Sequence, residues 1–248
     1  MTDNNINPVR NSDLFVDRAI SNGIKAIIFD LGNVLIDFDH SIAAKRISQF
    51  IPLETRGKDR VSLTGFTDKA EQEIFNLFFD SQLTGLFEEG KISALEFYSQ
   101  IKKILNLKLD YDEFLPIWNE IFFLSERNLA VYNLAKILKS RYKLALLSNI
   151  NILHFDYLKK NFLHLFDAFH HIITSFEAGF RKPHPLIYQK ALDILEVLPP
   201  NVFYTDDRPE LAENACKLGI RGFAFRGIEQ LKKNLLDTGS NSQTLEIS

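Results

Sequence analysis

Four short polar motifs, separated by long stretches of ordinary sequence, contain the side chains best suited to chemistry. In chain order they are Asp30, Ser148-Asn149, Arg181-Lys182-Pro183 and Asp206-Asp207. Carboxylates, a hydroxyl and an ammonium group around one point would form a site for Mg²⁺ and a phosphoryl group, because Mg²⁺ prefers oxygen ligands and phosphoryl oxygens need positive charge. A single strand-end carboxylate would indicate little, so this interpretation requires that the motifs meet.

Each motif also has a purely structural interpretation. Ser and Asn are favoured at helix N-caps, so Ser148-Asn149 could cap the following helix, and Asp206-Asp207 could cap the helix that starts near Pro209. Capping and phosphate binding are compatible, because a helix N-terminus offers free N–H groups. Lys182 could be an exposed loop lysine.

The elements around the motifs predict that they do meet. Residues 25–30 form an apolar run that ends in a carboxylate, which is typical of a buried parallel strand. From about residue 128 helices and strands alternate, with helices expected at 129–138, 152–162, 185–195 and 209–218 and strands at 143–147, 169–174, 202–205 and 222–225. This alternation predicts an α/β fold with a parallel sheet covered by helices on both faces. Neighbouring parallel strands end at one edge, so the motifs should face one crevice.

The stretch between the first strand and this alternation has a different character. Apolar residues in 40–127 recur at helical spacing, and no convincing strand is present. We therefore expect an all-helical domain inserted into the α/β core. The predicted division is an N-terminal extension (1–22), a core (23–39 and 128–238), a helical insertion (40–127) and a C-terminal tail (239–248).

These motifs occur in the order of the haloacid dehalogenase (HAD) superfamily, which the sequence resembles over about residues 24–228. The matching segments are 29–34 (FDLGNV), 147–149 (LSN), 179–183 (GFRKP) and 204–207 (YTDD). The insertion resembles the small helical C1 cap of that superfamily, in which the phrase at 89–93 (EGKIS) recurs. Within it, the sequence is most similar to the bacterial branch with a Gly-Asn first motif, which includes alpha-D-glucose-1-phosphate phosphatase. The resemblance implies a three-layer Rossmannoid sheet.

The resemblance also implies roles for individual residues. Asp30 would attack phosphorus and form an aspartyl-phosphate. Mg²⁺ would be bound by Asp30, the carbonyl of Gly32 and Asp207, with Asp206 as a direct or water-mediated partner. The transferring phosphoryl oxygens would be bound by Ser148, the backbone N–H of Asn149 and Lys182, with Gly32 and Asn33 close by. Arg181 would lie only beside the site.

One position departs from the pattern of the superfamily. Most of its phosphatases have Asp two residues after the nucleophile, as the acid that protonates the leaving oxygen, and this chain has Gly32 there. A general acid contributes about 10²- to 10⁴-fold, so its loss should favour better leaving groups, such as anomeric sugar phosphates, over alkyl phosphates. Asp37 and Asp39 are candidates for a substitute acid.

Composition narrows the class of protein and its partners. The chain has 248 residues, 46% of them hydrophobic, and a formal net charge of -3, so no basic field for nucleic acid is expected. A single cysteine, Cys216, allows no internal disulfide, and neither a signal peptide nor a membrane span is recognisable. We expect a cytoplasmic monomer or homodimer that acts on a small phosphorylated metabolite.

The remaining residues of interest have structural interpretations. The six histidines show no metal-ligand spacing, and His154 is the one closest to a motif. Trp118 and Phe122 are expected in the core of the helical insertion rather than in a substrate wall. Cys216 is expected to be buried in an amphipathic helix.

Four other functions remain possible. A dehalogenase would also use an Asp nucleophile but needs no metal, which the Asp206-Asp207 pair disfavours. A phosphomutase or phosphotransferase would need a group to activate its acceptor, and position 32 provides none. A non-catalytic phospho-ligand-binding protein is favoured by Gly32 and disfavoured by the retention of all four motifs. A receiver domain would have no inserted domain and about half this length.

Overall fold

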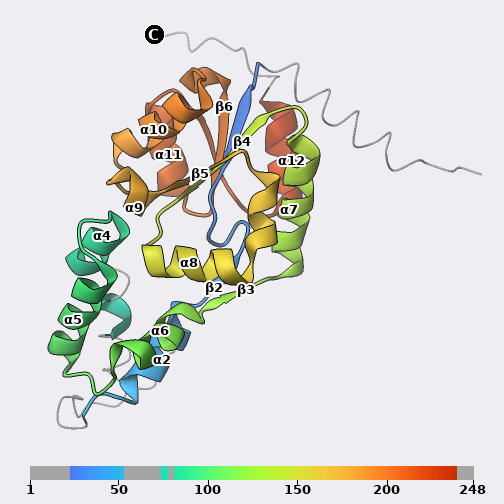
Figure 1. Ribbon diagram of the computed structural model, residues 1–248. Helices are drawn as coiled ribbons and strands as arrows, with labels where there is room; N and C mark the ends of the chain where they lie inside the picture. The colour runs from blue at the N-terminus through green and yellow to red at the C-terminus, as the bar shows by residue number, and fades with distance from the viewer. Residues whose placement is uncertain (1–22, 53–73, 78–80, 239–248) are drawn as a thin grey trace, which may run out of the picture.

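A five-stranded parallel sheet forms the centre of the computed structural model, which describes residues 23–52, 74–77 and 81–238 (Figure 1). The strands lie in the order β5-β4-β1-β6-β7, and their bounds are β1 Ala26–Phe29, β4 Lys143–Ser148, β5 His171–Thr174, β6 Val202–Asp206 and β7 Arg221–Ala224. All four pairings are parallel, so every strand ends at the same edge. β1 lies between β4 and β6, which places Asp30 at the middle of that edge.

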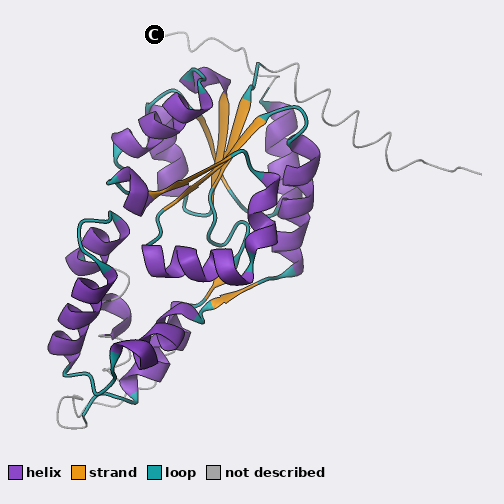
Figure 2. Ribbon diagram, viewed as in Figure 1, coloured by secondary structure: helices purple, strands orange, loops and turns teal. Residues whose placement is uncertain are grey.

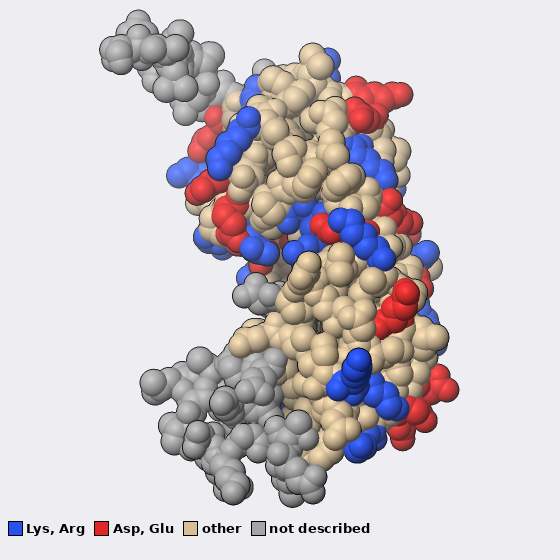
Figure 3. All heavy atoms as spheres, turned by 90° about the vertical axis from the view of Figure 1, so that its left-hand side faces the viewer, with Lys and Arg blue, Asp and Glu red and all other residues tan. Residues whose placement is uncertain are grey.

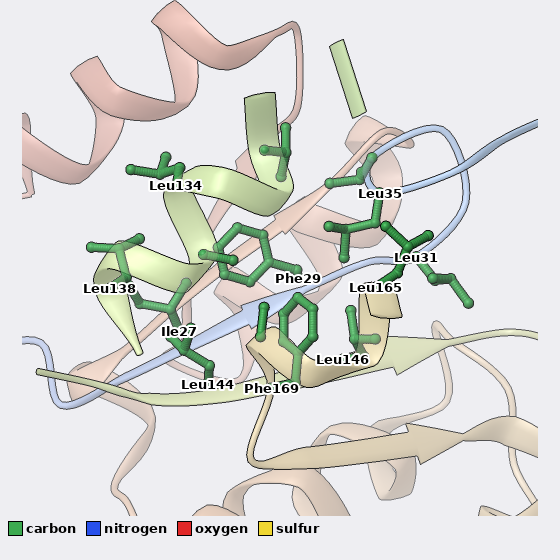
Figure 4. Packing of buried hydrophobic residues seen from close by; sticks show 14 of the residues in the cluster. Ile27, Phe29, Leu31, Leu35, Leu134, Leu138, Leu144, Leu146, Leu165 and Phe169 are labelled. Atoms are coloured by element: carbon green, nitrogen blue, oxygen red, sulfur yellow. The ribbon is translucent and has the colours of Figure 1, made fainter. Parts of the chain in front are cut away.

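Helices cover both faces of this sheet, as Figure 2 shows. Alternate strand residues point to opposite faces. Ile27 and Phe29 of β1 pack on the side of α7 (Glu126–Leu138) and α12 (Ile228–Asp237), whose packing Figure 4 shows around Leu134 and Leu138. Ala26 and Ile28 face α10 (Pro185–Leu195) and α11 (Pro209–Lys217). The three-layer α/β fold predicted from the sequence is therefore confirmed.

A second group of helices lies beyond the carboxyl edge of the sheet (Figure 1). It contains α2 (His40–Ser48), α4 (Gln82–Glu88), α5 (Ala94–Leu105) and α6 (Tyr111–Asn119). The ends are specified locally: Ser93 and Glu96 form a reciprocal capping box at the start of α5. These helices have a core of their own, built from Ala44, Ile47, Ile51, Ile74, Phe87, Phe97, Tyr98, Ile101, Leu107, Leu109, Phe114 and Trp118. The prediction for Trp118 is thus confirmed.

Two short strands connect the helical part to the sheet part. β2 (Asp37–Phe38) pairs antiparallel with β3 (Phe122–Phe123). The segment that leaves the core and the segment that returns to it therefore run side by side as a two-stranded ribbon. The expectation of no strand in 40–127 was therefore wrong, because two residues are too few to show strand alternation. Arg127 and Asn128 donate hydrogen bonds to Asp37 at 2.7 and 3.1 Å, which fastens the ribbon to α7.

Most expected elements are present with shifted ends. α7 begins three residues before its predicted start, because Ser125 and Asn128 form a capping box. The connecting elements α8 (Ile152–Asn161), η1 (Leu163–Ala168), α9 (Ser175–Ala178) and η2 (Pro199–Asn201) complete the core. The predicted N-terminal extension and C-terminal tail lie outside the described residues. Within the described ranges, no helix combines the length and apolar character needed to cross a bilayer.

The prediction for Cys216 was wrong. Its side chain is exposed, because the buried face of α11 is formed by Leu211, Ala212 and Ala215, and Cys216 lies one position beyond it. The thiol contacts the carbonyl of Gly222 at 3.5 Å.

Candidate active site

The motifs at the ends of the strands do meet, and a buried lysine connects two of them. The Lys182 ammonium donates hydrogen bonds of 2.7 Å to Oδ1 of Asp30 and 2.7 Å to Oδ2 of Asp206. Lys182 is only 4% exposed, so the alternative of a surface lysine is wrong. Asp30 follows β1, Asp206 ends β6 and Lys182 lies in the loop before α10. The parallel sheet therefore produces this cluster.

The carboxylates of this cluster have strongly perturbed electrostatics. Burial raises the pKa of Asp30 to about 7, although the charge of Lys182 acts in the opposite direction. Burial also acts to raise the pKa of Asp206, but the charge and hydrogen bond of Lys182 lower it overall. For Asp207, burial and the neighbouring charge of Asp206 raise the pKa despite a hydrogen bond from Asn33. Concentrated negative charge of this kind favours a bound cation.

Three carboxylates have the arrangement of a metal site. Asp30, Asp206 and Asp207 offer oxygens that lie within 4.8 Å of one another. Asn33, which adopts a left-handed conformation with φ 54°, donates a 2.9 Å hydrogen bond to Oδ2 of Asp207 and so orients it. Asp206 is already bound by Lys182, by the Tyr204 hydroxyl and by the backbone N–H of Arg208. Asp30 and Asp207 therefore have more freedom to bind a metal than Asp206.

Asn149 holds the lysine loop in place. Its side-chain amide donates to the carbonyl of Lys182 at 2.9 Å, and its Oδ1 accepts from the Lys182 N–H at 2.7 Å. This reciprocal pair fixes the backbone that carries the ammonium group. The alternative role as a helix cap was wrong for Ser148-Asn149, because Asn151 caps α8.

The second capping alternative was also wrong. α11 has Arg208 at its N-cap and no side-chain capping bond, although Asp206 does accept from the N–H of Arg208. Asp207 instead faces the cavity described next.

The cluster opens into a cavity of about 450 Å³ between the sheet and the helical part. Of the predicted site residues, all except Asp206 line it. The lining consists of Asp30, Leu31, Gly32, Asn33, Ile36, Phe38, His40, Phe75, Glu88, Phe122, Ser148, Asn149, Ile150, His154, Arg181, Lys182, Pro183, Asp207, Arg208 and Leu211. Its size fits a small metabolite. Phe122 belongs to this wall, so its assignment to the core of the helical insertion was wrong.

The space beside Gly32 is occupied by an aromatic ring. A Cβ at position 32 would lie 2.6 Å from Cε1 of Phe38, so no side chain fits there while this ring is in place. Asp37 and Asp39, the candidates for a substitute acid, do not line the cavity. Asp37 binds Arg127, and Asp39 caps α2 by accepting from the N–H of Ser41. Of these three neighbouring residues, only Phe38 lines the cavity, so the structure gives no support to Asp37 or Asp39 as the substitute acid.

His154 links the two parts of the molecule at the back of the cavity. Its Nε2 lies 3.1 Å from the carbonyl oxygen of Trp118, and its Nδ1 lies 3.1 Å from the Asn151 amide nitrogen. A carbonyl can only accept, so Nε2 carries the proton and Nδ1 accepts. Burial lowers the pKa of His154 to about 4, against the effect of the Trp118 carbonyl. The imidazole is therefore neutral at pH 7.

Acid is expected to destabilise the protein through His154. Since the ordinary pKa is 6.5 and the folded value about 4, the unfolded state binds more protons between these values, and the free energy of unfolding rises with pH across that window. From pH 7 to pH 5 the wild type should lose about 2 kcal/mol more than His154→Gln. Urea denaturation at both pH values measures this. The exposed His171→Gln is the matched control, and equal losses in the wild type and His154→Gln would contradict the prediction.

Three residues at the site were missed or underrated by sequence reasoning: Glu88 and Arg181 in the cavity wall, and Tyr204 behind Asp206. Glu88 lines the cavity and accepts a 2.7 Å hydrogen bond from Arg181. Arg181 also lines the cavity, so it is part of the site and does not lie only beside it. Glu88 directly precedes the recurrent phrase at 89–93, and this is the signal that could have found it. Tyr204 donates to Asp206 from within β6, and a tyrosine in a buried strand carries no such signal.

Comparisons with known proteins agree with this geometry. A family model described as haloacid dehalogenase-like hydrolase matches residues 24–213. The chain is 27% identical over 208 residues to D-ribitol-5-phosphate phosphatase of Bacteroides thetaiotaomicron, covering 81% of this chain and 91% of that protein. It is 38% identical over 64 residues to Flavin mononucleotide hydrolase 1 of Arabidopsis thaliana, covering 26% of each.

Solved structures show the same fold. The magnesium complex of a HAD family enzyme from Bacteroides thetaiotaomicron has a TM-score of 0.66 at 25% identity, covering 82% of this chain and 93% of that one. A HAD-like family hydrolase from Porphyromonas gingivalis has a TM-score of 0.60 at 21% identity, covering 81% and 90%. The family model spans most of the chain and includes all four motifs, and on this evidence the protein belongs to the haloacid dehalogenase-like hydrolases.

Proposed function

We propose that the protein is a Mg²⁺-dependent phosphatase that acts on a small phosphorylated metabolite through an aspartyl-phosphate on Asp30. The observation that carries this proposal is the Lys182 ammonium between the carboxylates of Asp30 and Asp206, at the floor of the cavity. Such a cluster combines a nucleophile with a cation that attracts phosphoryl oxygens.

The donor set fits Mg²⁺, because carboxylate and carbonyl oxygens are the ligands this ion prefers. Asp30, Asp207 and the carbonyl of Gly32 would hold it, with Asp206 bound directly or through water. The raised pKa of Asp207 supports this assignment, since a cation would offset the repulsion that burial and Asp206 impose. When bound, Mg²⁺ would supply positive charge against the transferring phosphoryl group.

In the proposed reaction an oxygen of Asp30 attacks phosphorus, and the bond between phosphorus and the leaving oxygen breaks. Ser148, the N–H of Asn149 and Lys182 bind the phosphoryl oxygens during transfer. The leaving alkoxide takes its proton from water, because Gly32 offers none. Water then attacks phosphorus, the bond to Asp30 breaks, and inorganic phosphate and the free carboxylate result.

The chemistry of the relatives narrows the proposed substrate. D-ribitol 5-phosphate is a polyol phosphate, and flavin mononucleotide carries its phosphate on a ribityl chain. We therefore propose a phosphorylated polyol or sugar as the substrate. Anomeric sugar phosphates remain in the proposal because the absence of an acid at Gly32 favours better leaving groups.

Phosphate release from a substrate panel tests this function. The panel contains D-ribitol 5-phosphate, glucose 1-phosphate, glucose 6-phosphate and p-nitrophenyl phosphate, each with Mg²⁺ and with a chelator. Metal-dependent release from at least one metabolite is the expected result. Folded protein that binds these phosphates without turnover would favour the phospho-ligand-binding alternative, and metal-independent halide release from a 2-haloacid would favour the dehalogenase.

The Phe38 ring explains how a proton donor could be restored. Gly32→Asp alone should fail to gain activity, because its Cβ would meet Phe38 at 2.6 Å, whereas Gly32→Asp with Phe38→Ala has room for the carboxyl group. Relative to Phe38→Ala alone, the double variant should raise kcat for D-ribitol 5-phosphate by about 10²-fold.

The gain for p-nitrophenyl phosphate should be smaller, because its leaving group needs no proton. Steady-state kinetics of the three variants on both substrates measure this. A gain of the same size on both substrates would show that the new carboxylate does not act as an acid.

A further inference from the structure

A charge pair crosses the boundary between the helical part and the sheet part at the cavity. Nη1 of Arg181 donates a 2.7 Å hydrogen bond to Oε2 of Glu88. Glu88 ends α4, whereas Arg181 directly precedes Lys182 in the loop that Asn149 fixes. Figure 3 shows charged side chains of both signs gathered at the waist between the two parts of the molecule. The pair therefore connects the helical part to the phosphate-binding end of the cavity.

Two glycines of the helical part, Gly85 and Gly90, allow its backbone to pack closely against residues of the sheet part. A Cβ at Gly85 would lie 3.5 Å from the Arg181 guanidinium, so the group packs flat against α4. Gly90 has φ 65°, and a Cβ there would lie 2.3 Å from the carbonyl oxygen of Phe176 in α9. Only glycine permits that approach. The backbone before and after Glu88 is thus packed against residues of the sheet part.

The Glu88 carboxylate lines the cavity and has acceptor capacity beyond its bond to Arg181. Arg181 binds Oε2, and within the part of the chain that the structure describes this is the one hydrogen bond to the Glu88 side chain. A carboxylate has about four lone-pair sites, so most of them remain for other donors. Burial raises the pKa of Glu88, and the bond and charge of Arg181 act against this. Much of the surrounding wall is aromatic, from Phe38, Phe75 and Phe122.

We propose that Glu88 is a specificity-determining residue that accepts hydrogen bonds from hydroxyl groups of a polyol phosphate, and that Arg181 is the positioning residue that orients it. This inference rests on the proposed function and names how its substrate class is selected. Hydroxyl groups of a ligand can donate to the remaining acceptor sites of the Glu88 carboxylate, whereas a ligand without hydroxyls leaves it bound by Arg181 alone.

Glu88→Leu and Glu89→Leu form a matched pair of variants for the test. The Glu89 carboxylate binds Lys91 at 2.7 Å, and Glu89 does not line the cavity, so Glu89→Leu should behave as wild type. For D-ribitol 5-phosphate and D-glucitol 6-phosphate, Glu88→Leu should lower kcat/KM by about 10- to 100-fold, mainly through KM. For phenyl phosphate, which lacks hydroxyls, the loss should stay within about threefold. Equal losses on all three substrates would overturn the inference and indicate a role in closing the cavity.

Binding measurements separate this inference from the proposed function. In an Asp30→Asn background, calorimetry with D-ribitol 5-phosphate and with inorganic phosphate measures affinity without turnover. Glu88→Leu should weaken binding of the polyol phosphate and leave that of inorganic phosphate in place. If the wild type shows no turnover, the proposed function fails, but this comparison still decides the role of Glu88. Absent polyol phosphate binding, or binding that Glu88→Leu does not weaken, would overturn the inference.

The role of Arg181 has a separate readout. If Arg181 acts by orienting Glu88, Arg181→Met should raise KM for D-ribitol 5-phosphate in the wild type but add little in the Glu88→Leu background. Independent, multiplying effects would overturn the positioning role.

Discussion

Replacing Asp30 by Asn is expected to reduce phosphate release by about 10⁴-fold or more, because the amide cannot attack phosphorus. The fold should tolerate the change. Asn has the same shape, and burial already raises the pKa of Asp30 to about 7, so the folded state gains little from the charged form. Lys182 keeps its second partner, Asp206, at 2.7 Å. Phosphate release and urea denaturation of the same preparation separate the two effects.

Asp39→Asn is the control for this experiment. Asp39 lies outside the cavity and caps α2, and Asn caps helices as well as Asp does, so both activity and stability should be retained. Should Asp30→Asn keep more than about 1% of the activity, the nucleophile lies elsewhere.

Replacing Lys182 by Met is expected to damage both stability and turnover. The Lys182 side chain is 2% exposed and its ammonium binds two carboxylates, so its removal leaves these buried carboxylates without their countercharge. Breaking a buried pair in this way costs about 3–5 kcal/mol of unfolding free energy. Turnover should fall by about 10²- to 10³-fold from the lost stabilisation of the phosphoryl oxygens. Denaturation at pH 7 and phosphate release measure the two losses.

A second substitution distinguishes these losses. Adding Asp206→Asn to Lys182→Met removes one of the two buried negative charges that Lys182 no longer balances. The free energy of unfolding should therefore recover in part, while turnover stays low. Arg226→Met provides the comparison, because Arg226 is a cation near the site that does not line the cavity. Its guanidinium donates to the backbone carbonyl of Asp207 at 3.2 Å and to no carboxylate of the cluster. Unchanged stability in Lys182→Met would contradict the idea that this lysine holds the carboxylates together.

The sequence predicted the sheet and the meeting of its four motifs because both depend on local, repeated signals. Apolar runs of strand length alternate with amphipathic helices, and the strands end in polar residues such as Asp30 and Asp206. Parallel pairing then brings those ends together at one edge of the sheet, independently of the conformation of the connecting loops. Short elements gave no such signal, as the ribbon of β2 and β3 shows.

The walls of the cavity were harder to predict, because they depend on how the helical part packs against the sheet part. Phe38 and Phe122 resemble any other aromatic core residues in sequence, and Glu88 resembles a surface carboxylate. Their function follows from contacts between distant segments, such as the bond from Arg181 to Glu88 across 93 positions. Asp37 and Asp39 lie outside the cavity lining although they are close to Asp30 in sequence, because proximity in sequence does not determine which way a side chain points.

The central place of β1 in the sheet also has a consequence for synthesis on the ribosome. β1 is made first, yet both of its partners, β4 and β6, come much later in the chain. Asp30 lies 152 positions before Lys182, and Asn33 lies 174 positions before Asp207. The apolar run of β1 therefore emerges long before anything can pair with it, which invites nascent-chain aggregation or chaperone binding. A premature stop anywhere before β6 would leave a chain whose most buried strand has an open edge.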